Sequence, residues 1–155
     1  MFGLGLTVSA VTNAAGLAVI DLAKVVESST YLKQQNASLK QSVQPTSAKL
    51  EQLGKELEAL QQKAKSANQA DLQKITAQYQ AKVGEFNSMQ QGLQTKVQSS
   101  LQAMNSTFET RVKQAAEQLR KENNLDFVLN KNSAIASDAQ YDLTDKMIQK
   151  VNAIK

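Results

Sequence analysis

The side chains that most often carry out chemistry are scarce in this sequence. Among 155 residues there is no Cys and no His, which removes thiol nucleophiles, the usual zinc ligands and the side chain that titrates near neutral pH. Ser and Thr are numerous, but no Ser/Lys arrangement stands out, and we interpret them as helix-surface and turn residues. Glu56 and Glu58 fall on different faces of a helix, which argues against shared acid–base work. We therefore expect a binding protein without a catalytic, cofactor or metal site, and not an enzyme.

The composition is typical of long helices. The chain is 41% hydrophobic but only 5% aromatic, with a single Pro, a combination that disfavours an ordinary globular enzyme. The net charge of +4 would attract acidic polypeptides and, weakly, an anionic membrane surface. The lysines stand singly along the chain, without the basic run and aromatic residues of a nucleic-acid surface, so no nucleic-acid partner is expected.

The first residues resemble an export signal. Residues 1–14 carry no charge and contain the apolar stretch Leu4–Val11, which predicts a signal peptide cleaved after Ala14 or, alternatively, after Ala10. The basic residues that usually open a signal peptide are missing. The other interpretation is a buried strand or helix of the folded domain. Nothing later in the chain has the run of about 20 apolar residues that a membrane-spanning helix needs.

A helical pattern follows from about Lys24. Apolar residues recur at steps of three and four from Leu32 to Ala67 and again from Leu72 to Leu119, as a continuous helix–helix seam requires. Small and polar residues at 66–70 separate the two series. The sequence therefore predicts an antiparallel helical hairpin, a coiled-coil arm over 24–123 with its tip near 66–70.

The two apolar series also predict which residues face each other. With the tip centred on Asn68, Ala64 lies opposite Leu72 and Leu57 opposite Tyr79. The polar interruptions match as well, because Asn36 then faces Ser100 and each could meet a hydrogen-bonding partner.

Four residues that weaken helices occur at two levels of this hairpin. Pro45 falls almost opposite Gly92, and Gly54 almost opposite Gly84. Proline removes an intrahelical hydrogen bond, and a mid-helix glycine costs about 1 kcal/mol relative to alanine. We interpret both levels as elbows of the arm. The alternative is that the glycines allow close packing of the two helices.

The two ends of the chain contain the predicted strands. Leu17–Leu22 is expected to be a buried strand, and 125–129 and 133–137 to form a β-hairpin around a turn at 130–132. Asp142 is the expected N-cap of a final helix. Residues 15–23 and 124–155 would thus form one small β body, giving an α+β, mostly α fold.

So few short strands cannot enclose a good core alone, and open sheet edges invite pairing between chains. Self-association through the body is therefore expected. The residues predicted to be buried between subunits are Leu17, Val19, Phe127, Leu129 and Ile135.

Three segments resemble the Skp/OmpH family of ATP-independent periplasmic chaperones: 17–22 (LAVIDL), 124–130 (NLDFVLN) and 141–145 (YDLTD). With the order strand, helical hairpin, strands and final helix, the resemblance covers essentially the whole chain after the leader. It implies a homotrimer whose strands join in a shared central sheet or barrel. It also implies that the arms surround a cavity where unfolded outer-membrane proteins are held in the periplasm.

One feature of the family is not expected here. Some members carry a tight basic cluster that is proposed to bind lipopolysaccharide, whereas Lys74, Lys82 and Lys96 stand singly, so we predict no such site. Among the arm residues, Met89 is a candidate client contact because methionine adapts to varied surfaces. Its alternative role is in the helix seam.

Two other functions fit parts of the pattern. A structural coiled-coil envelope spacer protein would show the same helices and export signal but no chaperone activity. A cytosolic prefoldin-like chaperone would share the hairpin but not the leader. The strands and the terminal helix argue against a plain rod.

Overall fold

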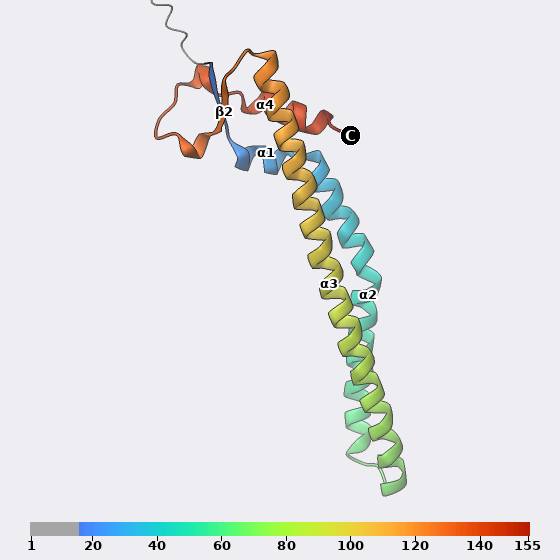
Figure 1. Ribbon diagram of the computed structural model, residues 1–155. Helices are drawn as coiled ribbons and strands as arrows, with labels where there is room; N and C mark the ends of the chain where they lie inside the picture. The colour runs from blue at the N-terminus through green and yellow to red at the C-terminus, as the bar shows by residue number, and fades with distance from the viewer. Residues whose placement is uncertain (1–15) are drawn as a thin grey trace, which may run out of the picture. The chain divides into compact units, whose positions relative to one another are not determined.

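The computed structural model describes residues 16–155 (Figure 1). The signal peptide predicted for 1–14 lies outside the described residues. The chain divides into two compact units: the strand unit contains the described residues up to Ser29 together with Arg111–Lys155, and the arm unit is Thr30–Thr110. No helix of the described part is long and apolar enough to cross a bilayer. The elements are β1 (Leu17–Ile20), α1 (Leu22–Ser28), α2 (Thr30–Ala64), α3 (Gln69–Glu122), β2 (Phe127–Asn130), η1 (Lys131–Ser133), η2 (Ala139–Tyr141) and α4 (Thr144–Ala153).

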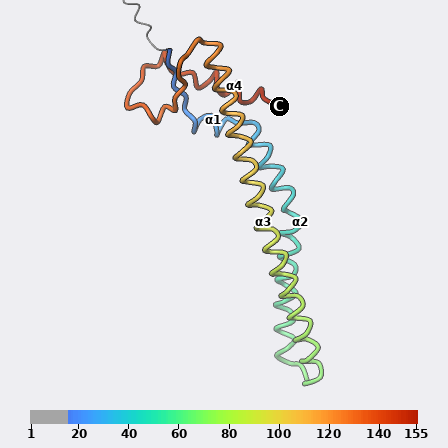
Figure 2. The backbone as a smooth tube through the Cα atoms, viewed as in Figure 1, coloured from blue at the N-terminus to red at the C-terminus, as the bar shows by residue number. Residues whose placement is uncertain are grey.

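The sheet of the strand unit is a parallel pair, in which β1 aligns with β2 from Leu17 opposite Phe127 to Ile20 opposite Asn130. Figure 2 shows these two stretches of chain side by side. On the other edge of β1, the Val19 carbonyl accepts a hydrogen bond from the Leu143 amide at 3.0 Å. Both edges of β1 are therefore paired within the chain.

The predicted β-hairpin of 125–129 with 133–137 is wrong. Only its first strand forms, as β2, and 134–137 is not a strand. Instead of a tight β-turn, Asn130 begins the 3₁₀ turn η1, because its side chain accepts from the Asn132 amide at 3.3 Å. β2 pairs with β1 instead, since β1 offers a buried apolar strand.

Helix formation also departs from expectation at the start of the arm. The helix expected from about Lys24 begins at Leu22, where Asp21 caps it by accepting from the Lys24 amide at 3.1 Å. It stops at Ser29, whose backbone is extended and which is buried. The freed Ser28 carbonyl accepts from the side chain of Asn152 in α4 at 3.2 Å. This contact explains the break between α1 and α2.

Glycine is required at one position near β1. A Cβ atom at Gly16 would lie 2.8 Å from the Asn124 carbonyl oxygen. Asn124 itself has a φ of 51°, the left-handed conformation that ends many helices. The backbone of the strand unit thus closes tightly where α3 turns into β2.

Within the arm unit, α2 ends at Ala64 and α3 starts at Gln69. The expected facing pairs are displaced by about one turn: Ala64 shares a hollow with Ile75, not Leu72, and Tyr79 shares it with Leu60. Leu72 is 41% exposed, so the first turn of α3 extends past the end of α2 (Figure 1). The displacement arises because the link between the helices is not centred on Asn68, which instead caps α3 by accepting from the Asp71 amide at 2.9 Å.

The polar match expected at Asn36 is also wrong. Its amide nitrogen donates to the Leu32 carbonyl of its own helix at 2.9 Å. Ser100 lies instead at a hollow with Leu39 and Ser42. The same one-turn displacement separates Asn36 from its expected partner.

The C-terminal helix is held by a buried hydroxyl. Thr144 is 4% exposed; its Oγ1 accepts from the Asp21 amide at 2.9 Å and donates to Asp142 Oδ1 at 2.5 Å. Asp142 also accepts from Lys131 Nζ at 2.8 Å, and these bonds, led by the one from Lys131, hold the pKa of Asp142 well below its usual range. Asp142 thus lies at the start of α4 as expected, but the N-cap position itself is Leu143.

Replacing Thr144 tests this connection. Thr144→Val leaves the Asp21 amide without its acceptor, so we expect a loss of about 1–3 kcal/mol in the free energy of unfolding. Thr110→Val is the control, because that hydroxyl donates only to the Ser106 carbonyl of its own helix and is exposed. Urea unfolding of both full-length variants measures the difference. Equal stability of the two variants would contradict the role of Thr144.

Candidate functional site

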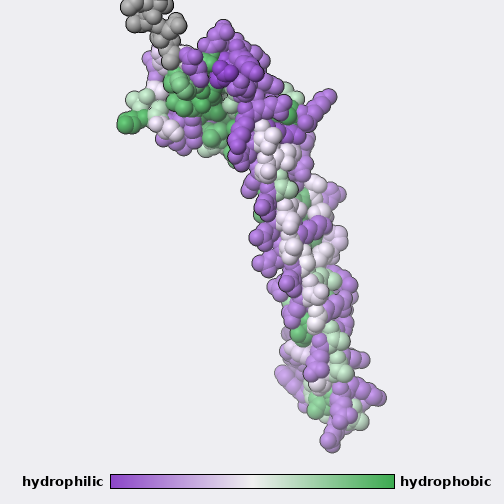
Figure 3. Space-filling view, viewed as in Figure 1, coloured by the Kyte–Doolittle hydropathy of each residue, from purple (hydrophilic) through white to green (hydrophobic). Residues whose placement is uncertain are grey.

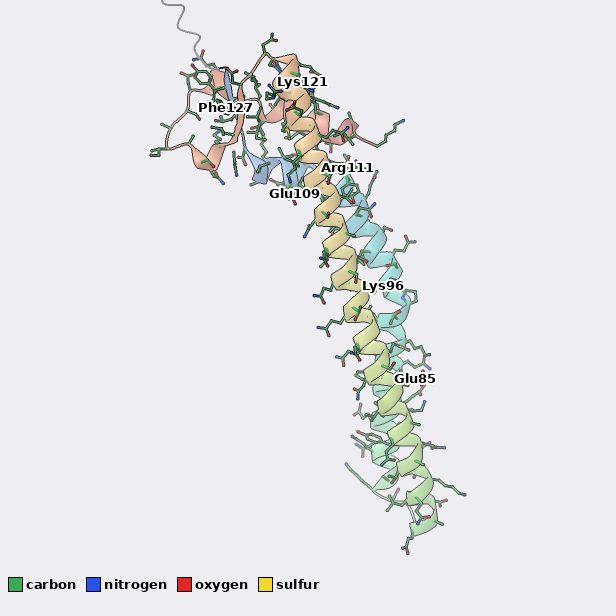
Figure 4. The ribbon with its side chains drawn as sticks, in the orientation of Figure 1. Glu85, Lys96, Glu109, Arg111, Lys121 and Phe127 are labelled. Atoms are coloured by element: carbon green, nitrogen blue, oxygen red, sulfur yellow. The ribbon has the colours of Figure 1, made fainter. Side chains whose placement is uncertain are left out.

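The residues predicted to lie between subunits occupy different environments in the strand unit. Val19 is 1% exposed and is already part of the core, while Leu17 is half-buried. Phe127 and Leu129 are 55% and 40% exposed, and Ile135 is fully exposed. Figure 4 labels Phe127 on β2. The single chain therefore covers Val19 itself and leaves three of the five side chains available to a partner.

The exposure of β2 has a simple cause. Phe127 and Leu129 point to the same face of a two-residue repeat, and β2 pairs with β1 along one edge only in the described part of the chain. Tyr141, at 43% exposure, is another large exposed side chain of this unit that sequence reasoning did not select. An open edge beside exposed apolar side chains favours association with another chain.

Within the arm unit, the seam between α2 and α3 is only partly closed. Its buried side chains are Leu53, Leu60 and Met104. Two ion pairs bridge the helices, Lys82 with Glu56 and Lys49 with Glu85 at 2.9 Å. The hydrogen bond from Lys82 lowers the pKa of Glu56, and the same bond raises the pKa of Lys82.

The two predicted elbow levels differ in what surrounds them. Gly54 and Gly84 lie beside the buried Leu53 and the two bridging ion pairs. Near Pro45 and Gly92 the only printed cross-helix bond is from Lys96 Nζ to the Ser42 carbonyl at 3.1 Å. Glu85 and Lys96, on successive levels of α3, are labelled in Figure 4. Bending is therefore more easily accommodated at Pro45 and Gly92.

The packing alternative for the glycines does not hold. A Cβ atom added at Gly54, Gly84 or Gly92 would meet nothing within 4 Å. None of the three is needed for close approach of the helices in the single chain. What remains for them is conformational freedom, which the elbow prediction requires.

A surface on α3 escaped the sequence interpretation. Leu93, Val97 and Leu101 were expected to lie in the seam, but they line an open groove together with Gln90, Gln94 and Gln98. We call these six residues the α3 groove. Leu101 is 38% exposed. The signal that could have revealed it is the run of four-residue steps, which drifts around a helix of 3.6 residues per turn.

Met89, the predicted client contact, lies half-buried on α3 just before this groove. Its role stays a prediction. The described residues contain no group of acidic side chains that could hold a metal ion. In Figure 3 hydrophobic residues interrupt the hydrophilic surface of the arm unit in small areas rather than in one broad patch.

The fold and these surfaces define a class of protein that binds through an extended helical hairpin and a small associating sheet. A crystal structure with the same fold is that of a Caulobacter crescentus protein assigned provisionally as an OmpH-like outer membrane chaperone. The TM-score is 0.74 at 22% sequence identity, covering 99% of this chain and 88% of that one. No curated protein matches the sequence.

The family itself is shown by the sequence. Residues 16–151 match the model of the family described as outer membrane protein (OmpH-like), so the chain belongs to the OmpH-like family. The resemblance found in the three short segments is thereby confirmed.

Alanine substitutions test the freedom of the glycines. Gly54→Ala, Gly84→Ala and Gly92→Ala should each stabilise the arm by about 0.5–1 kcal/mol, because a helical alanine loses less backbone entropy and its Cβ has room. Gly92→Ala should also increase amide protection near Pro45 more than Gly84→Ala does near Gly54. Thermal unfolding and hydrogen exchange measure both effects, with Gly16→Ala as the destabilising control. A loss of stability at all three arm positions would show that another chain packs there.

Charge on β2 tests the association surface. Phe127→Asp should convert an oligomer into a monomer in sedimentation experiments at micromolar concentration, because burying an unpaired carboxylate between subunits is strongly unfavourable. Val26→Asp is the matched control, since Val26 is also exposed, at 47%, but lies on α1. Unchanged sedimentation of the Phe127 variant would exclude β2 from the interface.

Proposed function

We propose that this protein is an ATP-independent periplasmic chaperone that holds unfolded outer-membrane proteins and prevents their aggregation. Membership of the OmpH-like family and the OmpH-like chaperone with the same fold support a chaperone type of function. In this proposal the protein is exported by a signal peptide at 1–14, acts without catalysis and forms a homotrimer through β2. Its clients lie in a cavity between helical arms.

The observation that carries the proposal is the α3 groove. Leu93, Val97 and Leu101 offer apolar contact without a partner helix, and three glutamine side chains beside them can hydrogen-bond an extended backbone. Apolar surface that a soluble chain leaves open usually marks an interaction site. A groove with small apolar side chains gives many weak contacts, which suit a client that must later be released.

Charge supports the same class of client. The net charge of +4 attracts acidic chains at long range and raises the rate of encounter. The excess arises in the arm unit, which has nine Lys and six Asp or Glu. A weak contact with an anionic membrane surface belongs to the proposal for the same reason.

The second candidate is a structural envelope spacer protein. It is favoured by the long uninterrupted α3, Gln69–Glu122, which a spacer would also need. The strand unit, with a core built from both ends of the chain, is an addition that a simple spacer does not require.

Suppression of aggregation tests the chaperone. The purified mature oligomer should suppress light scattering when an unfolded outer-membrane β-barrel is diluted from urea. Leu93→Gln with Leu101→Gln should raise the molar excess needed for half-suppression severalfold, because the apolar contact is lost. Val26→Gln with Leu72→Gln is the matched control, since it removes two other exposed apolar side chains. Failure of the unmodified protein at several-fold excess, with the oligomer intact, would favour the spacer.

A further inference from the structure

The tip of the arm unit combines two kinds of side chain at the end of the hairpin. Lys63, Lys65 and Lys74 surround the link between α2 and α3, and Leu72 is 41% exposed on the first turn of α3. We call these four residues the tip surface. Beside it lies a mostly apolar hollow, lined by Leu60, Ala64, Ile75 and Tyr79 with Gln61 and Thr76.

The positive charge of this region is largely uncompensated. Within 59–84 the sole carboxylate is that of Asp71, and it accepts from the Asn68 side chain at 2.7 Å. Lys82 is paired with Glu56. The ion pairs found among the described residues do not involve Lys63, Lys65 or Lys74.

The apolar part follows from the register of the hairpin. Because Ile75 takes the place beside Ala64 that Leu72 was expected to occupy, the first turn of α3 has no facing helix. Leu72 therefore remains exposed among basic residues. A soluble polyanion would need only the lysines, whereas an anionic amphiphile would use the lysines and the apolar side chains together.

We infer that the tip surface docks onto an anionic lipid membrane. The lysines bind the phosphates of the headgroups, and Leu72 enters the boundary between headgroups and acyl chains. The inference rests on the membrane contact of the proposed function and assigns it to named residues. Each lysine near an anionic surface strengthens binding about fivefold, so the contact is weak, reversible and sensitive to salt.

Vesicle binding of the full-length mature protein tests the lysines. Co-sedimentation with vesicles of phosphatidylcholine containing phosphatidylglycerol should be about 25-fold weaker for Lys65→Gln with Lys74→Gln. The control, Lys33→Gln with Lys40→Gln, loses the same two charges from α2 and should bind within about twofold of the unmodified protein. Equal weakening of the two double variants would overturn the proposal, because net charge alone would then explain binding.

Leucine 72 separates a membrane from an acidic peptide. Leu72→Gln should weaken vesicle binding severalfold and leave binding of polyglutamate unchanged. Vesicle binding that is indifferent to Leu72→Gln would overturn docking onto lipid and indicate a purely electrostatic site for acidic peptides. Circular dichroism of each variant confirms that the helices are intact.

Depth of insertion gives an independent readout. The chain has no Cys, so a polarity-sensitive fluorophore can be attached at Ser66→Cys in the tip and, as a control, at Ser47→Cys in the middle of α2. Anionic vesicles should shift the emission of the tip label to the blue and leave that of the control unchanged. The reverse result would overturn the proposal. Aggregation suppression in lipid-free buffer is measured separately, so a failure of client holding and a failure of membrane docking are distinguishable.

Discussion

The parallel pairing of β1 with β2 is the constraint on which the rest of the strand unit depends. Parallel strands cannot be joined by a tight turn and need a long crossover, and here the crossover contains α1, α2 and α3. The other edge of β1 is paired with 142–143, which positions α4. The unit is therefore assembled from contacts between distant parts of the chain, which form slowly because the loop must close first.

Sequence patterns predicted the elements whose signals are local. The helical hairpin, the strand at 17–20 and the final helix each have an apolar period of their own, and all are present. Partner choice was predicted wrongly for 125–129 because strand propensity says nothing about which strand will pair. The one-turn displacement at Leu72 was missed for a related reason: the register depends on the capping of α3 by Asn68, not on the centre of the polar segment.

The partly closed seam of the arm unit has consequences for both stability and binding. Few of its apolar side chains are buried, and exposed ion pairs such as Lys49 with Glu85 contribute little to stability. Helical propensity and a narrow apolar contact must therefore maintain the hairpin, which favours local bending where Pro45 and Gly92 weaken both helices. The same sparse burial leaves the α3 groove open, so modest stability and an available binding surface have one physical origin.

The separation of two surfaces along α3 bears on how holding and docking would combine. Leu72 and Val97 are 25 residues apart on one continuous helix, which corresponds to about 38 Å at a rise of 1.5 Å per residue. A membrane that receives Leu72 is thus kept well away from a client held near Val97. The lysines at the tip are also remote in sequence from the groove, where Lys96 is already engaged by the Ser42 carbonyl. Contact with lipid headgroups would therefore neutralise the charge that attracts acidic chains without covering the apolar side chains, which favours release of a client close to the membrane.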